Sequence, residues 1–122
     1  MSGYAIIVDF VLVPGKRAEF RRLVDRNARI SSKAERGCRH FDVLESRGEA
    51  DHIFLYEVYE DEAAFEAHVR SPHFNEFDRE SAPLVTNKSV IHCNLVCEGR
   101  PSAGNRKDVS RTKAGREGGE LA

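Results

Sequence analysis

The chain has 122 residues, of which 40% are hydrophobic and 32% are charged, and its formal net charge is −1. This length suits one small domain, and the composition is typical of globular proteins. The balanced charge argues against a nucleic-acid partner, and no apolar run approaches the roughly 20 residues that span a bilayer. Because "MSGYAIIVDF" also lacks the features of a signal peptide, we expect a cytoplasmic protein.

The first part of the chain has a strand signal followed by a helix signal. Residues 4–13, "YAIIVDFVLV", are rich in β-branched residues and end at a Pro-Gly turn, which predicts a strand. Over residues 15–36 apolar side chains recur every three or four positions, which predicts a helix. Gly37 stands where a left-handed cap would end that helix.

The rest of the chain continues with a hairpin, two helices and a strand. Residues 38–46 and 52–60 are predicted strands joined by a turn. Asp61 is a suitable N-cap for the short helix "EAAFEAHVR". The Ser-Pro step at 71–72 is typical of the start of a new helix, and residues 88–97 predict a fourth strand.

The element order is β-α-β-β-α-β, which predicts a ferredoxin-like α+β domain over residues 1–97. Residues 98–122 are polar and contain no aromatic residue, so we expect a flexible tail. Both faces of the first strand are apolar, whereas the helices can cover only one side of the sheet. A second copy of the chain would cover the other side, so we predict a homodimer.

Cys38, Cys93 and Cys97 are odd in number and lie beside apolar residues. An odd count does not make a disulfide framework, so we expect these cysteines to be reduced and buried.

Several polar side chains fall on otherwise apolar faces of the predicted helices. They are Asn27, Ser31, His68 and His73. His68 shares its face with Phe65, and His73 shares its face with Phe74. A buried polar group needs a hydrogen-bond partner, so these residues either bond within the core or line a shared cavity.

Glu57 is flanked by apolar residues on the third predicted strand. Alternation puts it on the same side of the sheet as Tyr59 and on the opposite side from Tyr56. Because a buried, unpaired carboxylate is costly, we expect Glu57 to pair with an arginine or a histidine, or to serve a functional site.

The two histidines favour proton transfer over metal binding. His68 and His73 are five residues apart across a helix break, which is not the spacing of helical metal motifs, so we predict no metal. The chain also lacks glycine-rich phosphate loops and nucleophile elbows. A histidine in an apolar cavity can exchange a proton with a bound molecule.

Three segments together resemble the antibiotic biosynthesis monooxygenase family. They are "VLVPGKRAEF", "NARISSKAERGCRHFDVLES" and "IFLYEVYEDEAAFEAHVRSPHFNEF". The resemblance implies a dimeric α+β barrel that uses O2 to oxidise a small electron-rich aromatic or quinol substrate without a cofactor. The "FDVL" and "YEVY" runs are most similar to the branch of quinol monooxygenases and autoinducer-2 phosphate isomerases. The chain has no tryptophan, which argues against haem.

By this resemblance Asn27, His68 and His73 fall on pocket positions, and we predict them to be catalytic. We predict substrate contacts from Ser31, His40, Glu57, Tyr56, Phe65 and Phe74. His40 stands where we expect arginine or glutamine in the relatives, so the resemblance does not define the head group of the substrate.

Two alternatives to a monooxygenase stay open. One is an isomerase of a small phosphorylated hydroxy-diketone, in which Arg29 or Arg39 could bind the phosphate. The other is a non-catalytic binding or stress module, because a fold does not by itself imply an activity.

Overall fold

A computed structural model of the chain describes residues 3–99. Its elements are β1 (Gly3–Leu12), α1 (Arg17–Ala34), β2 (Cys38–Glu45), β3 (His52–Tyr59), α2 (Glu62–Val69), α3 (Pro72–Ser81), the 3-10 turn η1 (Ala82–Leu84) and β4 (Val85–Leu95). The predicted order is confirmed, and the last strand begins three residues earlier than expected. Except for residues 98 and 99, the predicted tail lies outside the described residues.

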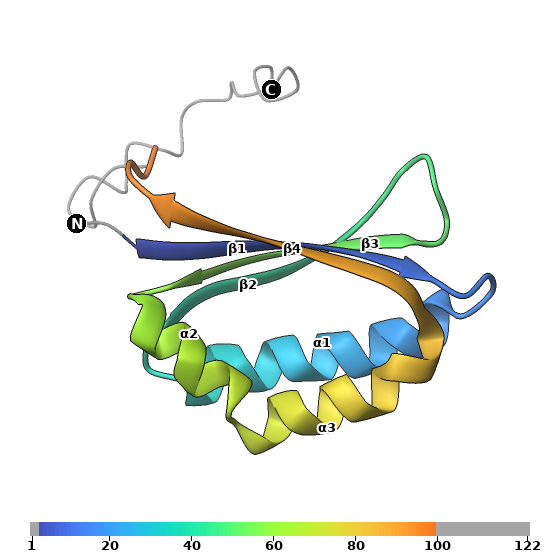
Figure 1. Cartoon of the computed structure of the whole chain (residues 1–122), viewed down its shortest axis with the longest axis horizontal. Coiled ribbons are helices and arrows are strands. Elements are labelled where there is room, and N and C mark those ends of the chain that lie inside the picture. The colour runs from blue at the N-terminus through green and yellow to red at the C-terminus, as the bar shows by residue number, and fades with distance from the viewer. Residues whose placement is uncertain (1–2, 100–122) are drawn as a thin grey trace, which may run out of the picture.

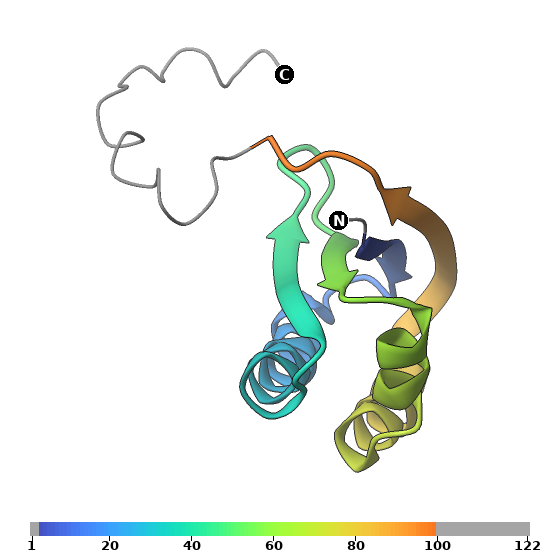
Figure 2. The ribbon, with the colours of Figure 1, turned by 90° about the vertical axis from the view of Figure 1, so that its left-hand side faces the viewer.

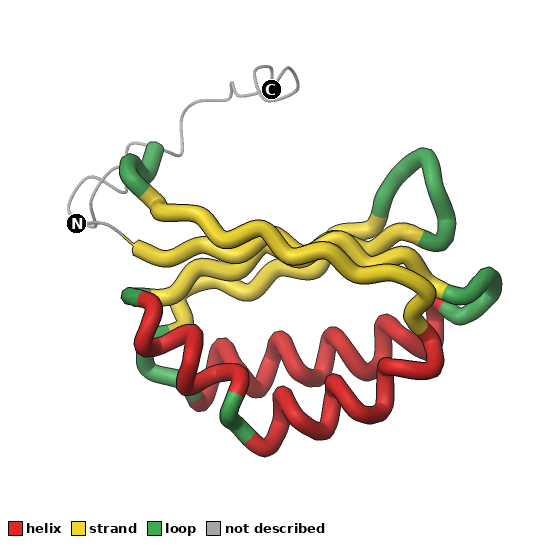
Figure 3. The backbone as a smooth tube through the Cα atoms, viewed as in Figure 1, coloured by secondary structure: helices red, strands yellow, loops and turns green. Residues whose placement is uncertain are grey.

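The four strands form one antiparallel sheet in the order β2-β3-β1-β4. All three helices lie against one face of the sheet (Figures 1 and 3). In the end-on view, α1 runs beneath β2, and the α2–α3 pair runs beneath the other side of the sheet (Figure 2). The predicted ferredoxin-like α+β fold is therefore confirmed, with its second helical unit divided into two helices.

The core lies between the sheet and the helices. On β1, Ile6, Val8 and Phe10 face inward and are almost fully buried. The ring of Phe10 packs against Phe20 of α1, with 4.8 Å between the ring centroids. Burying a side chain of this size contributes about 1.5–3 kcal/mol, so this layer holds α1 to the sheet.

The outer face of the sheet carries no helix (Figure 1). Ile7, Leu44 and Ile91 are large apolar residues that are 39%, 49% and 56% exposed. Ile7 and Ile91 are paired neighbours on β1 and β4. The expectation that one side of the sheet is left uncovered within this chain is therefore met.

Gly37 does not adopt the left-handed conformation that we expected. Gly15, in the turn before α1, is the glycine with positive φ (+85°) among residues 3–99. The chain needs a glycine at position 37 because a Cβ atom there would lie 2.5 Å from the Cβ of Ala64. The residue therefore allows the close approach of α2 to the loop after α1.

The three cysteines are free. Burial is the main cause that raises the pKa of the Cys38 thiol to about 12, and the negative charges of Glu35 and Glu57 contribute to this value. Cys38 and Cys93 are half-buried, and Cys97, which follows the end of β4, is exposed, so the expectation that all three are buried is wrong. Within residues 3–99 we find no helix with the length and apolar character needed to cross a membrane.

Candidate functional site

A cavity of about 110 Å³ lies between the sheet and the helices. Most of its wall is apolar, and Phe41, Phe65 and Phe74 contribute aromatic rings. The polar residues that line it are Asn27, Glu57, His68 and Lys88. An apolar cavity with a few convergent polar groups is the usual form of a small-molecule site.

Asn27 faces this cavity from the middle of α1. It is 3% exposed, and its amide oxygen has no hydrogen-bond partner among the described residues. Leaving a buried acceptor unpaired costs about 1–3 kcal/mol. This favours a cavity that binds a ligand with a hydrogen-bond donor over a residue satisfied within the core.

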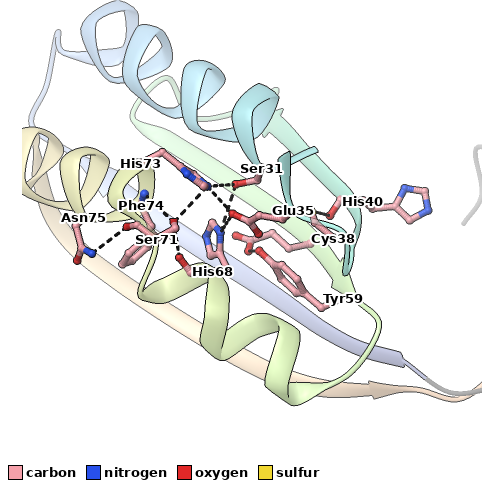
Figure 4. Close-up of polar contacts among 11 residues, drawn as sticks. Ser31, Glu35, Cys38, His40, Tyr59, His68, Ser71, His73, Phe74 and Asn75 are labelled. Carbon is pink, nitrogen blue, oxygen red and sulfur yellow. Dashed lines mark hydrogen bonds and ion pairs between the residues drawn. The ribbon is translucent and has the colours of Figure 1, made fainter. Parts of the chain in front are cut away.

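His68 reaches the cavity from the last turn of α2. Asp61 starts this helix, because its side chain accepts a hydrogen bond from the backbone N–H of Ala64 at 2.9 Å. Nδ1 of His68 lies 2.9 Å from Oε2 of Glu35 and 3.3 Å from the hydroxyl of Ser31 (Figure 4). The histidine is 2% exposed.

His73 approaches the same carboxylate from α3. Its Nε2 makes a short contact with Oε2 of Glu35 and lies 3.1 Å from the Ser31 hydroxyl. Ser71 caps α3 by accepting from the N–H of Phe74 at 3.2 Å, and it donates to the carbonyl of His68 at 2.7 Å (Figure 4). The Ser-Pro break therefore brings both histidines to one carboxylate.

The contacts with Glu35 set the protonation pattern of the two rings. An ionised carboxylate only accepts hydrogen bonds, so it favours the tautomers with hydrogen on Nδ1 of His68 and on Nε2 of His73. This leaves Nε2 of His68 as its basic nitrogen. Burial lowers the pKa of His68, and the hydrogen bond to Glu35 opposes this shift. His68 is therefore a neutral, oriented base near pH 7.

Sequence reasoning missed Glu35, and it also missed Lys88 and Phe41, which line the cavity. Glu35 lies just after α1, and a charged residue at a helix end is usually solvated. The sequence feature that could have revealed Glu35 is the four-residue spacing of Asn27, Ser31 and Glu35, which is the spacing of residues on one helix face. The second carboxylate oxygen, Oε1, is buried without a hydrogen-bond partner in the described part of the chain.

Glu57 lines the cavity from β3, on the side of the sheet expected from alternation. It is 4% exposed, and its Oε1 accepts a hydrogen bond from the hydroxyl of Tyr59 at 2.7 Å. The partner is therefore a tyrosine and not the expected arginine or histidine. Burial raises the pKa of Glu57 to about 7, against the opposing effects of the Tyr59 hydrogen bond and the charge of Lys88.

His40 and Tyr56 do not reach this cavity. They lie on the outer face of the sheet, with their ring centroids 6.2 Å apart. His40 points away from the histidine cluster (Figure 4). The reason is strand alternation, because Tyr56 directly precedes the inward-facing Glu57. Of the other predicted substrate contacts, Phe65, Phe74 and Glu57 line the cavity. Ser31 does not line it, and its hydroxyl contacts Nδ1 of His68 instead.

The ligand atoms of Glu35, His68 and His73 lie within 4.8 Å of one another, which is close enough to hold a metal ion. The same three atoms already satisfy one another as a hydrogen-bonded group. Dialysis against a chelator would distinguish a metal-holding cluster from a purely hydrogen-bonded one.

Comparison with known proteins identifies the fold family. The model of the family "Antibiotic biosynthesis monooxygenase" matches residues 3–80. The chain belongs to this family. A Mycobacterium tuberculosis protein named "Putative monooxygenase Rv0793" is 34% identical over 91 residues, covering 74% of this chain and 87% of that protein. The family that we predicted from the "FDVL" run and its neighbouring segments is thereby confirmed.

Solved structures agree with this assignment. The crystal structure of the same M. tuberculosis protein has a TM-score of 0.68 at 29% identity and covers 82% of this chain and 99% of its own. A Pseudomonas aeruginosa structure, PA3566, has a TM-score of 0.73 at 24% identity and covers 80% of this chain and 97% of its own. At 24% identity, the similarity to the P. aeruginosa structure shows that the two proteins share a fold. Membership of the family supports a monooxygenase-like activity.

Proposed function

We propose that this protein is a cofactor-independent monooxygenase that oxidises a small electron-rich phenol or quinol with O2. The observation that carries the proposal is His68, which lines an apolar cavity while its Nδ1 is tied to Glu35. This leaves a basic nitrogen available, in the way that a carboxylate orients the histidine of a catalytic triad. Asn27 supplies a polar group for the charge that develops on the substrate oxygen.

The reaction needs no reductant other than its substrate. His68 accepts the proton of the substrate hydroxyl, and the resulting phenolate transfers an electron to O2. Radical recombination at a ring carbon gives a peroxide. Loss of the proton on that carbon and cleavage of the O–O bond then form a carbonyl group and water. The sum is phenol plus O2 to quinone plus water, and one oxygen atom goes to each product.

The size of the cavity limits the substrate. A cavity of about 150 Å³ holds one benzene molecule in an engineered protein. The cavity here is about 110 Å³, and its wall includes Val90, which is 39% exposed on the edge strand β4. We therefore propose a substrate with a single aromatic ring inside the cavity and any larger substituent directed toward solvent.

Oxygen consumption with a panel of single-ring phenols and quinols tests the proposal. We expect His68→Ala to lower turnover by about 100-fold or more, because general bases typically contribute factors of about 10²–10⁴. His52→Ala is the control, since His52 contacts Asp9 and Glu49 and none of these three residues lines the cavity. Dialysis against EDTA should leave the rate unchanged. Equal rates for wild type and His68→Ala across the panel would refute the proposal.

An isomerase of a phosphorylated hydroxy-diketone is a second candidate, and Lys88 is the observation that favours it. This cation lines the cavity and could bind a phosphate there, whereas Arg39 pairs with Glu98 at 3.2 Å. Deuterium exchange into such a substrate, and its loss in Lys88→Met, would support this candidate. Binding of either ligand class without turnover would instead indicate a non-catalytic module.

We also propose that the protein is a homodimer that packs through the outer face of the sheet. Support comes from Ile7, Leu44 and Ile91, which are exposed there and would be covered by a second copy. Sedimentation equilibrium should give a dimer at micromolar concentration, and Ile91→Lys should weaken it. A stable monomer in wild type would exclude this interface.

A further inference from the structure

The cavity contains a second group that can carry a proton, on the wall opposite the helices. Glu57 rises from β3 and is 4% exposed, whereas His68 descends from α2 and is 2% exposed. Both side chains line the same cavity. A molecule bound there would therefore lie between a carboxyl group on the sheet and an imidazole on the helix.

The environments of the two groups push their protonation in opposite directions. Burial favours the neutral form of each, which for Glu57 is the protonated acid and for His68 is the unprotonated base. Such divergence commonly separates the acid from the base of an active site. Near neutral pH the cavity thus holds a proton donor and a proton acceptor at once.

The charged and titratable neighbours of Glu57 come from all the elements around it. Tyr59 on β3 donates a hydrogen bond to it, Lys88 faces it from β4, and His68 faces the same cavity from α2. Two more groups interact with it through their charges. They are Glu35 after α1 and Cys38 on β2. Only Tyr59 is hydrogen-bonded to the Glu57 carboxyl group among residues 3–99.

We propose that Glu57 is a second proton-transfer residue, which protonates the peroxide formed on the substrate and then removes the proton from the oxidised ring carbon. This inference rests on the proposed monooxygenase function. Glu57 gives its proton to the terminal peroxide oxygen and becomes a carboxylate. That carboxylate takes the ring C–H proton as the O–O bond breaks. The departing hydroxide takes from His68 the proton that came from the phenol, so water leaves and both residues return to their starting forms.

Replacing Glu57 with glutamine separates this role from a structural one. Glutamine can still accept the hydrogen bond of Tyr59 but has no proton to exchange. We expect Glu57→Gln to lower kcat by about 100-fold or more. Glu57→Asp, which keeps a carboxyl group, should retain more activity. Glu60→Gln is the matched control, because Glu60 is an exposed glutamate three residues along the chain.

The pH dependence of kcat gives a readout that a structural role would not change. If protonated Glu57 is needed, activity falls as the pH rises through about 7, which is the pKa that burial gives this residue. Tyr59→Phe removes the bond that favours the ionised form, so the alkaline limb should move to higher pH. In Glu57→Gln this limb should disappear. Turnover by Glu57→Gln at the wild-type rate with an unchanged limb would overturn the inference.

Infrared difference spectroscopy tests the protonation state without turnover. Wild type should show a protonated-carboxyl C=O band that is lost as the pH rises through about 7. The band should be absent from Glu57→Gln and present in Glu60→Gln. Its absence from wild type would overturn the inference whatever the rates. If wild type consumes no oxygen with any substrate, the proposed function itself fails, whereas an unchanged Glu57→Gln in an active enzyme refutes only the role of Glu57.

Discussion

Oε2 of Glu35 lies 2.9 Å from Nδ1 of His68, although the two residues are 33 positions apart in the sequence. This contact joins the loop after α1 to the last turn of α2. The same oxygen contacts His73 at the start of α3. One carboxylate therefore fixes the positions of all three helices at this end of the molecule and the orientation of the histidine that faces the cavity.

Glu35→Gln should change the titration of His68. The Glu35 carboxylate raises the pKa of this histidine against the larger effect of burial. Without the negative charge, the pKa of His68 should fall further below 6.5, the ordinary value of a histidine. An NMR titration of the imidazole C–H resonances would measure this shift.

The resonance of His52 serves as the internal control, because its carboxylate partners are Asp9 and Glu49. A His68 titration curve that is identical in wild type and Glu35→Gln would mean that the contact has no electrostatic effect.

The free energy of unfolding of Glu57→Gln should increase relative to that of wild type as the pH rises. The pKa of Glu57 is about 7 in the folded protein and 4.5 as an ordinary glutamate, so between these values the folded state holds a proton that the unfolded state has lost. Stability conferred by this group is then lost as the pH rises through that window. The difference corresponds to about 3 kcal/mol at about 1.4 kcal/mol per pH unit. Urea unfolding at pH 4.5 and pH 8 would measure it.

The contribution of His68 to stability has the opposite dependence on pH, so it must be separated from that of Glu57. Burial lowers its pKa, so the unfolded state binds more protons below pH 6.5 and stability falls as the pH decreases. The comparison between wild type and Glu57→Gln cancels this contribution. The expectation fails if the difference in unfolding free energy between the two proteins is the same at both pH values.

Ser71→Ala should destabilise the protein by about 1 kcal/mol, as is typical when an N-cap is lost. It also removes the hydrogen bond to the carbonyl of His68. The effect should therefore exceed that of Asp61→Ala, a cap that contacts only its own helix in the described structure. Denaturant unfolding of the two variants would compare them, and an equal or smaller loss in Ser71→Ala would contradict the added role of this hydroxyl.

Gly37→Ala should cost about 1–3 kcal/mol, because the new methyl group would overlap the Cβ of Ala64. Gly48→Ala is the control, since a Cβ atom there meets nothing within 4 Å. The double variant Gly37→Ala/Ala64→Gly should recover part of the loss in thermal unfolding. No recovery would show that the clash is not the source of the destabilisation.

Local sequence patterns were sufficient to predict the fold. Strand alternation, helical periodicity and the Ser-Pro step act within a few residues of one another, so each element could be read from its own segment. The inward direction of Asn27 and His68 followed from the same local periodicity, and both line the cavity.

Contacts between distant segments could not be predicted in this way. Glu35 is not among the predicted site residues, because its two partners, His68 and His73, lie on other helices. The proximity of Gly37 to Ala64 was hidden for the same reason, so its glycine was ascribed to backbone conformation. The predicted substrate contacts of His40 and Tyr56 are wrong, because both side chains lie on the outer face of the sheet, where alternation already placed Tyr56.

The hydrogen-bonded cluster around Glu35 lies at helix ends, and the phenylalanines of the cavity wall come from other parts of the chain. Glu35, Ser31 and the two histidines meet at helix termini, whereas Phe41 and other phenylalanines on different elements shape the cavity wall. Under the proposed function, substitutions of the phenylalanines should change the size of substrate that fits while the hydrogen-bonded group of Glu35, Ser31 and the histidines stays intact.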